Sequence, residues 1–181
     1  MAYLILGLIL WTVAHLFKRV APELRERVGN AGKGLVALGV LVGLVLMVIG
    51  YRQAAFIHVW APPAWTVHLN NLMMLGAVFL YGMSATKGRL RGAMRHPQLT
   101  AVKVWAVAHL LVNGDLASLI LFGGLLGWAV LEVAIINMAE DWDRPAPGEA
   151  KRDIVLVIIT IVLFFAMTFV HNWLGVWPFP G

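Results

Sequence analysis

The sequence predicts an all-α integral membrane protein, a polytopic bundle of about six transmembrane helices forming a single domain over residues 1–181. Three observations lead to this fold class. Hydrophobic residues make up 61% of the chain and the mean hydropathy is +0.83, whereas soluble domains are about half apolar. Only 13% of the residues are charged. Several apolar runs approach the ~20 residues that a helix needs to cross a bilayer.

The apolar runs predict the six spans. They cover residues 2–17, 34–51, 69–85, 98–112, 116–137 and 154–173. The first run has no basic residue before it, and its lysine and arginine come after it. A cleavable signal shows the opposite order, so we expect the first run to stay in the protein as a membrane helix.

The segments between the runs carry turn signals. Two prolines within 61–65 are expected to break the chain out of helix. Pro97 suits the first turn of the fourth span, where its missing N–H is no loss. The Asn-Gly-Asp sequence at 113–115 predicts a tight turn, because Asn and Gly tolerate positive φ and Asp115 can cap the next helix. Spans four and five should therefore form a helical hairpin.

The basic residues predict the orientation. Five lie in 18–33, four in 84–97 and three in 138–153, which makes twelve of the fourteen in the chain. Basic loops stay in the cytoplasm, so both termini should lie outside, which is the periplasm if the membrane is a bacterial inner membrane. The sequence pI near 10 then reflects topology, and the expected partner is the lipid bilayer with no nucleic acid.

Two of the six histidines lie deepest in the predicted spans, and their surroundings match. The sequences are Trp11-Thr-Val-Ala-His15-Leu and Trp105-Ala-Val-Ala-His109-Leu. Ionisable side chains inside a membrane are costly and usually face a bundle interior, a cavity or a cofactor. Two neutral imidazoles on different helices are the usual protein ligands of a membrane b-type haem. We predict haem b with its iron between His15 and His109 and with Trp11 and Trp105 as walls. The alternative is that a histidine such as His109 simply hydrogen-bonds a neighbouring carbonyl or hydroxyl across helices.

Five other ionisable positions are candidates of a different kind. His96 and Glu132 lie near the inner end of the predicted hairpin, where they could bind a polar ligand or move a proton. A local ion pair that holds the hairpin together is the alternative. His58, His68 and His171 fall near the outer face with several tryptophans, which is typical of an interfacial belt and also allows an outer metal or haem-edge site. Cysteine is absent, so thiolate metal sites and disulfides are excluded.

The stretch RHPQLTAVKVWAVAHLLVNGDLASLILFGG at 95–124 resembles the signature of the NnrU family, and WTVAHLFKR near the start extends the resemblance. NnrU proteins are associated with nitrite and nitric oxide reductase clusters in denitrifying bacteria. Their relatives include plastid zeta-carotene isomerases, which hold haem b between two histidines. The resemblance implies His15 and His109 as iron ligands, a role in reductase function or maturation, and reductase components as partners. A cysteine-assisted ligand change is impossible here, which argues against carotene isomerisation.

A more distant resemblance is to isoprenylcysteine-type membrane methyltransferases, which share Arg-His-Pro, a helical hairpin and following acidic residues. It implies that His96, Glu132 and Glu140 border an S-adenosylmethionine pocket on the cytoplasmic side. The stretch MAEDWDRPAPGE lacks the basic and acidic run that such enzymes carry after the hairpin. The methyltransferase is therefore the second reading and a non-catalytic scaffold the third, and the sequence leaves open whether the protein is an enzyme.

Overall fold

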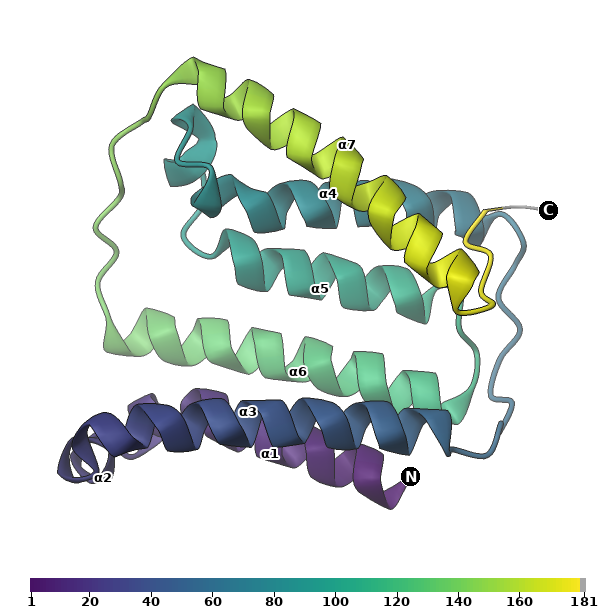
Figure 1. The fold of residues 1–181 in the computed structure, drawn as a ribbon, viewed down its shortest axis with the longest axis horizontal. Coiled ribbons are helices and arrows are strands. Elements are labelled where there is room, and N and C mark those ends of the chain that lie inside the picture. Colours follow the sequence, from purple (N-terminus) through teal and green to yellow (C-terminus); the bar gives the residue numbers. More distant parts are fainter. Residues whose placement is uncertain (180–181) are drawn as a thin grey trace. The chain divides into compact units, whose positions relative to one another are not determined.

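The computed structural model describes residues 1–179, and this part of the chain is helical with no β-strand. Each of the six predicted apolar runs forms a helix, so the predicted all-α class is confirmed (Figure 1). The elements in order are α1 (Ala2–Val20), α2 (Pro22–Arg27), α3 (Gly29–Arg52), α4 (Thr66–Ala85), the 3₁₀ helix η1 (Arg89–Gly92), α5 (Pro97–Leu110), α6 (Leu116–Ala139) and α7 (Ala150–Trp173).

Four of these helices, α1, α3, α6 and α7, are long and apolar enough to cross a membrane, with a mean hydropathy of 2.8 in α7. Many large exposed side chains of α7 are also apolar, including Ile154, Ile158, Val162, Phe165 and Phe169. Soluble proteins rarely expose a continuous apolar surface of this kind. The protein is therefore a multi-pass membrane protein with these helices facing lipid.

By the same criterion of length and hydropathy, the described residues contain four candidate spans, whereas the sequence predicts six. Helix α5 has 14 residues, which span only about 21 Å at 1.5 Å per residue. Helix α4 has 20 residues but carries His68, Asn70 and Asn71 in its first two turns. Six spans stay a prediction for these two helices.

The contacts divide the described chain into two compact units. Unit 1 comprises Met1–Trp60 and Gly114–Glu140, and unit 2 comprises Ala61–Asn113 and Asp141–Gly181. Because α5 belongs to unit 2 and α6 to unit 1, the hairpin expected between them stays a prediction, as does the single domain.

In unit 1, α1 and α3 form an antiparallel pair held by glycines. Gly50 near the end of α3 faces Leu4 near the start of α1, and Gly39 faces Ala14. A Cβ atom added to Gly43 would lie 3.0 Å from the main-chain nitrogen of Trp11. Glycines four residues apart, such as Gly39 and Gly43, let two helix backbones approach closely in a membrane. This contact fixes the position of α1, which carries His15.

The turn before α6 has the predicted helix cap, but its backbone conformation differs from the expected one. The Asp115 side chain accepts a hydrogen bond from the main-chain N–H of Ser118 at 2.9 Å, which confirms the predicted cap. The tolerance of Asn and Gly for positive φ, on which the tight turn was predicted, is not used, since neither Asn113 nor Gly114 has a positive φ. Instead the N–H of Val59 donates to the Gly114 carbonyl at 2.8 Å. Next to this pairing, Asp115 has an extended backbone conformation.

In unit 2, α4 packs against both α5 and α7 (Figure 1). Leu156 of α7 packs over Gly82 of α4, where a Cβ atom would lie 2.8 Å from its methyl carbon. The Asp153 carboxylate accepts hydrogen bonds from the N–H groups of Arg89 and Leu90 at 3.2 and 3.4 Å, which holds η1 at the start of α7. Pro97 opens α5 at its first turn, as predicted.

Candidate cofactor site

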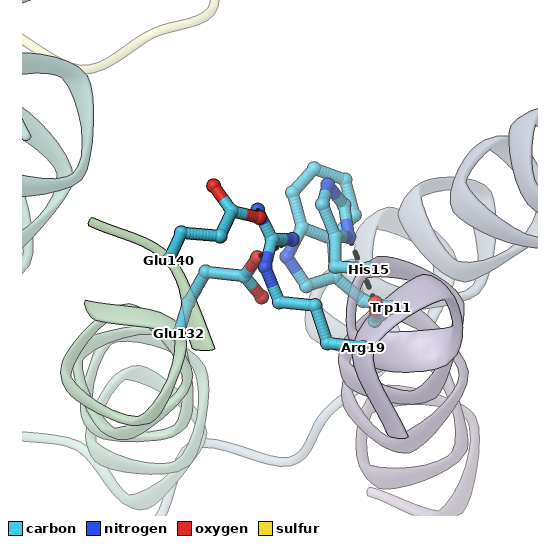
Figure 2. Close-up of polar contacts among 5 residues, drawn as sticks. All are labelled: Trp11, His15, Arg19, Glu132 and Glu140. Atoms are coloured by element: carbon cyan, nitrogen blue, oxygen red, sulfur yellow. Dashed lines mark hydrogen bonds and ion pairs between the residues drawn. The ribbon is translucent and has the colours of Figure 1, made fainter. Parts of the chain in front are cut away.

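One face of α1 carries three side chains spaced four residues apart, Trp11, His15 and Arg19. Side chains at this spacing lie above one another on a helix. Figure 2 shows all three directed toward Glu132 of α6 and Glu140, the residue that follows α6. Trp11 and His15 were predicted from the sequence as site residues and Arg19 was not, although it follows His15 at the same four-residue spacing.

The ring of His15 is oriented by its own helix. Its Nδ1 lies 2.8 Å from the main-chain carbonyl oxygen of Trp11 (Figure 2). A carbonyl can only accept, so Nδ1 carries the proton and donates it. In the neutral ring Nε2 is then unprotonated, which is the form that binds a metal. Within residues 1–179 no group hydrogen-bonds Nε2 of His15.

Two tryptophan rings enclose this histidine. The ring centroids of Trp11 and His15 are 4.3 Å apart, and those of Trp128 and His15 are 4.8 Å apart. The two indoles meet edge to face at 5.5 Å. Such edge-to-face contacts stabilise aromatic clusters. His15 therefore lies in an apolar aromatic wall made by α1 and α6.

Glu132 is paired with a residue that the sequence analysis did not consider. Nη1 of Arg19 donates to its Oε1 at 2.8 Å, and the two side chains are 19% and 7% exposed. Nη2 of Arg19 lies 3.7 Å from a carboxylate oxygen of Glu140, which is half exposed. The ion pair expected around Glu132 exists, but it joins α6 to α1. His96 lies in unit 2, at the N-cap of α5, where its carbonyl accepts from the N–H of Thr100 at 2.9 Å.

Several polar atoms in this cluster of unit 1 are buried without a hydrogen-bond partner among the described residues. They are Nε1 of Trp11, Nε of Arg19, Nε1 of Trp128 and Oε2 of Glu132. Buried donors and acceptors are almost always satisfied in native proteins, so each exception calls for an explanation. Three of the four atoms are donors.

His109 in unit 2 repeats the arrangement of His15. Its Nδ1 donates to the carbonyl oxygen of Trp105 at 2.9 Å, and the two ring centroids are 5.1 Å apart. The neighbouring Asn113 donates to the main-chain carbonyl of His109 at 2.8 Å. Both histidines thus bond carbonyls, but each bond is made to the tryptophan of its own helix and fixes the ring, whereas the alternative expected a bond across helices.

The other histidines differ in detail. His171 on α7 donates from Nδ1 to the carbonyl of Met167 at 2.8 Å, so it shares the bond and lacks the tryptophan. His58 lies in the loop after α3, in an isolated bridge with Asp115. His68 is exposed on α4. The bond to a carbonyl alone therefore does not distinguish His15 and His109; the preceding tryptophan does.

The donor set suits haem iron better than a bare metal ion. Within residues 1–179 no group of three or more His, Asp or Glu side chains is placed to hold a metal. A zinc ion takes three or four protein ligands. Haem iron is coordinated by its macrocycle and needs only one or two axial ligands from the protein. One or two histidines beside aromatic rings can supply these axial ligands.

The fold defines a multi-pass helical membrane protein. Two of its histidines are oriented by a hydrogen bond to the carbonyl of a preceding tryptophan. The chain belongs to the NnrU family: the family model described as NnrU protein matches residues 3–178, nearly the whole chain. No curated protein and no solved structure matches it.

Proposed function

We propose that this protein binds haem b in the membrane, with His15 and His109 as axial ligands, and serves denitrification. One observation carries the proposal: the same Trp-His arrangement occurs in both units, and in each the histidine Nδ1 donates to the tryptophan carbonyl, at 2.8 and 2.9 Å. The role in denitrification is supported by membership of the NnrU family. Reductase components are the partners expected from that role.

The chemistry of the two side chains fits this function. A hydrogen bond from Nδ1 fixes the tautomer and orientation of an imidazole and makes Nε2 a better ligand. A neutral imidazole adds no charge inside the membrane, where an isolated charge is costly. Trp11 and Trp105 exclude water from the faces of their histidines. Bound haem supplies a one-electron iron centre, whose potential the axial ligands help to set.

Alanine substitutions test the ligands. We expect His15→Ala and His109→Ala each to lose most of the haem b spectrum of the purified protein, because each removes a ligand. His171→Ala is the matched control, since it removes a histidine with the same Nδ1 bond and no tryptophan. It should keep the spectrum. Equal spectra in all three variants would rule out the assigned ligands.

The physiological half of the proposal has its own measurement. In a denitrifying host without its own copy of the gene, the unaltered protein and His171→Ala should restore nitrite or nitric oxide reductase activity. His15→Ala should not. Restoration by His15→Ala would separate the denitrification role from the histidine.

We also propose that both termini lie in the periplasm, supported by the twelve of fourteen basic residues that fall in three loops. The chain has no cysteine, so a single introduced thiol can be labelled without background. A membrane-impermeant maleimide should label Ala2→Cys in spheroplasts, and should label Glu26→Cys in α2 only after lysis. The reverse pattern would invert the topology.

A further inference from the structure

We propose that Trp11, Arg19 and Trp128 bind a carboxylate side chain of the haem whose iron His15 ligates. This inference rests on the proposed function and deepens it, because it assigns residues to the edge of the cofactor in addition to its iron. All of the residues belong to unit 1.

The unsatisfied donors carry the proposal. The indole N–H of Trp128, which is only 7% exposed, the indole N–H of Trp11 and the Nε–H of Arg19 have no acceptor among the described residues. Three buried donors in one cluster call for a group that offers several acceptor lone pairs. A carboxylate offers about four, and bonds to an ionised acceptor are the strong ones.

The donors also surround the proposed ligand. Trp11 and Arg19 lie one turn on either side of His15, about 6 Å away along the helix axis. Trp128 reaches His15 from α6, with ring centroids 4.8 Å apart. A large planar group held by Nε2 would therefore have its edge, and not only its centre, within reach of these side chains.

The charges in the cluster allow one more carboxylate. Arg19 and Glu132 are paired at 2.8 Å and nearly cancel each other. Glu140 lies farther from Arg19, at 3.7 Å, and is half exposed to solvent, which screens it. The core of ferric haem, Fe³⁺ with a porphyrin dianion, carries one net positive charge. A carboxylate on the same cofactor balances that charge within the membrane.

Esterified haem separates edge binding from iron ligation. The full-length apoprotein is titrated with haem b and with its dimethyl ester, which keeps the iron and loses the carboxylates. We expect the unaltered protein to bind haem b at least about tenfold more tightly than the ester, the effect of one charge-assisted hydrogen bond. Trp128→Phe and Arg19→Gln/Glu132→Gln should each weaken the binding of haem b by about tenfold more than they weaken the binding of the ester.

The double substitution removes both charges together, so it leaves no unpaired buried charge that could unfold the protein. Lys18→Gln is the matched control, because Lys18 is an exposed cation beside Arg19 on the same helix. It should bind both porphyrins like the unaltered protein.

The outcomes distinguish the two proposals. Equal affinity of the unaltered protein for haem b and the ester, or equal weakening of both by the variants, would overturn the carboxylate site and leave iron ligation intact. The donors would then be satisfied by water, or the residues would act through packing. Failure of the unaltered protein to bind either porphyrin would refute the proposed function itself, and the carboxylate site with it.

Discussion

Replacing Glu132 with alanine is expected to destabilise the protein by about 3–5 kcal/mol, the cost of leaving one partner of a buried ion pair alone. Glu132 accepts from Arg19 at 2.8 Å, and its side chain is 7% exposed. Without it the guanidinium of Arg19 loses its nearest countercharge. Unfolding by a denaturing detergent, followed by circular dichroism, measures the effect.

The matched comparison is Arg19→Met/Glu132→Met, which replaces both charges with apolar side chains of similar length. Replacement of a whole buried ion pair is often close to neutral, so this variant should be much more stable than Glu132→Ala. A double variant as unstable as the single one would mean that the ion pair does not join α1 to α6 as described.

Replacing Gly50 with valine is expected to cost about 3 kcal/mol or more, the upper range for overpacking, because the obstacle is backbone. A Cβ atom at Gly50 would overlap the main-chain nitrogen of Leu4 and lie 2.7 Å from its Cα. A backbone atom cannot turn aside as a side chain can. Helices α1 and α3 would have to separate, and His15 would move with α1. Unfolding in detergent and the yield of monodisperse protein report the loss.

Gly34→Val is the control for this substitution. Gly34 lies on the same helix, and nothing lies within 4 Å of a Cβ atom added there. The same gain in volume should therefore cost little. If the two valine variants were equally stable, the close glycine contact between α1 and α3 would be wrong.

The helices could be predicted from the sequence because hydropathy and helix breakers act locally. The apolar runs, Pro97 at the start of α5 and the Asp115 cap all follow from neighbouring residues. The turn conformation at 113–115 could not, because it depends on the pairing of Gly114 with Val59, more than fifty residues away. Tertiary hydrogen bonds overrode the local preference of Asn-Gly for positive φ.

In the candidate site, too, the local features could be predicted from the sequence and the tertiary contacts could not. The two matching Trp-His patterns could be recognised in the sequence. Each of the two Nδ1 hydrogen bonds lies within a single helix. The partner of Glu132 was not visible, because the register of α6 against α1 is set by packing. Periodicity gives the face of a helix and not the helix it meets. Arg19 could have been added to the candidates from its four-residue spacing after His15, although its partner could not.

The most direct test of the central claim is the haem content and iron spin state of the purified protein from haem-replete cells. Two axial imidazoles from His15 and His109 predict one haem b per chain, with b-type α and β absorption bands on reduction and a low-spin ferric signal in electron paramagnetic resonance. A colourless, iron-free preparation, or a high-spin signal typical of one axial ligand, would contradict it.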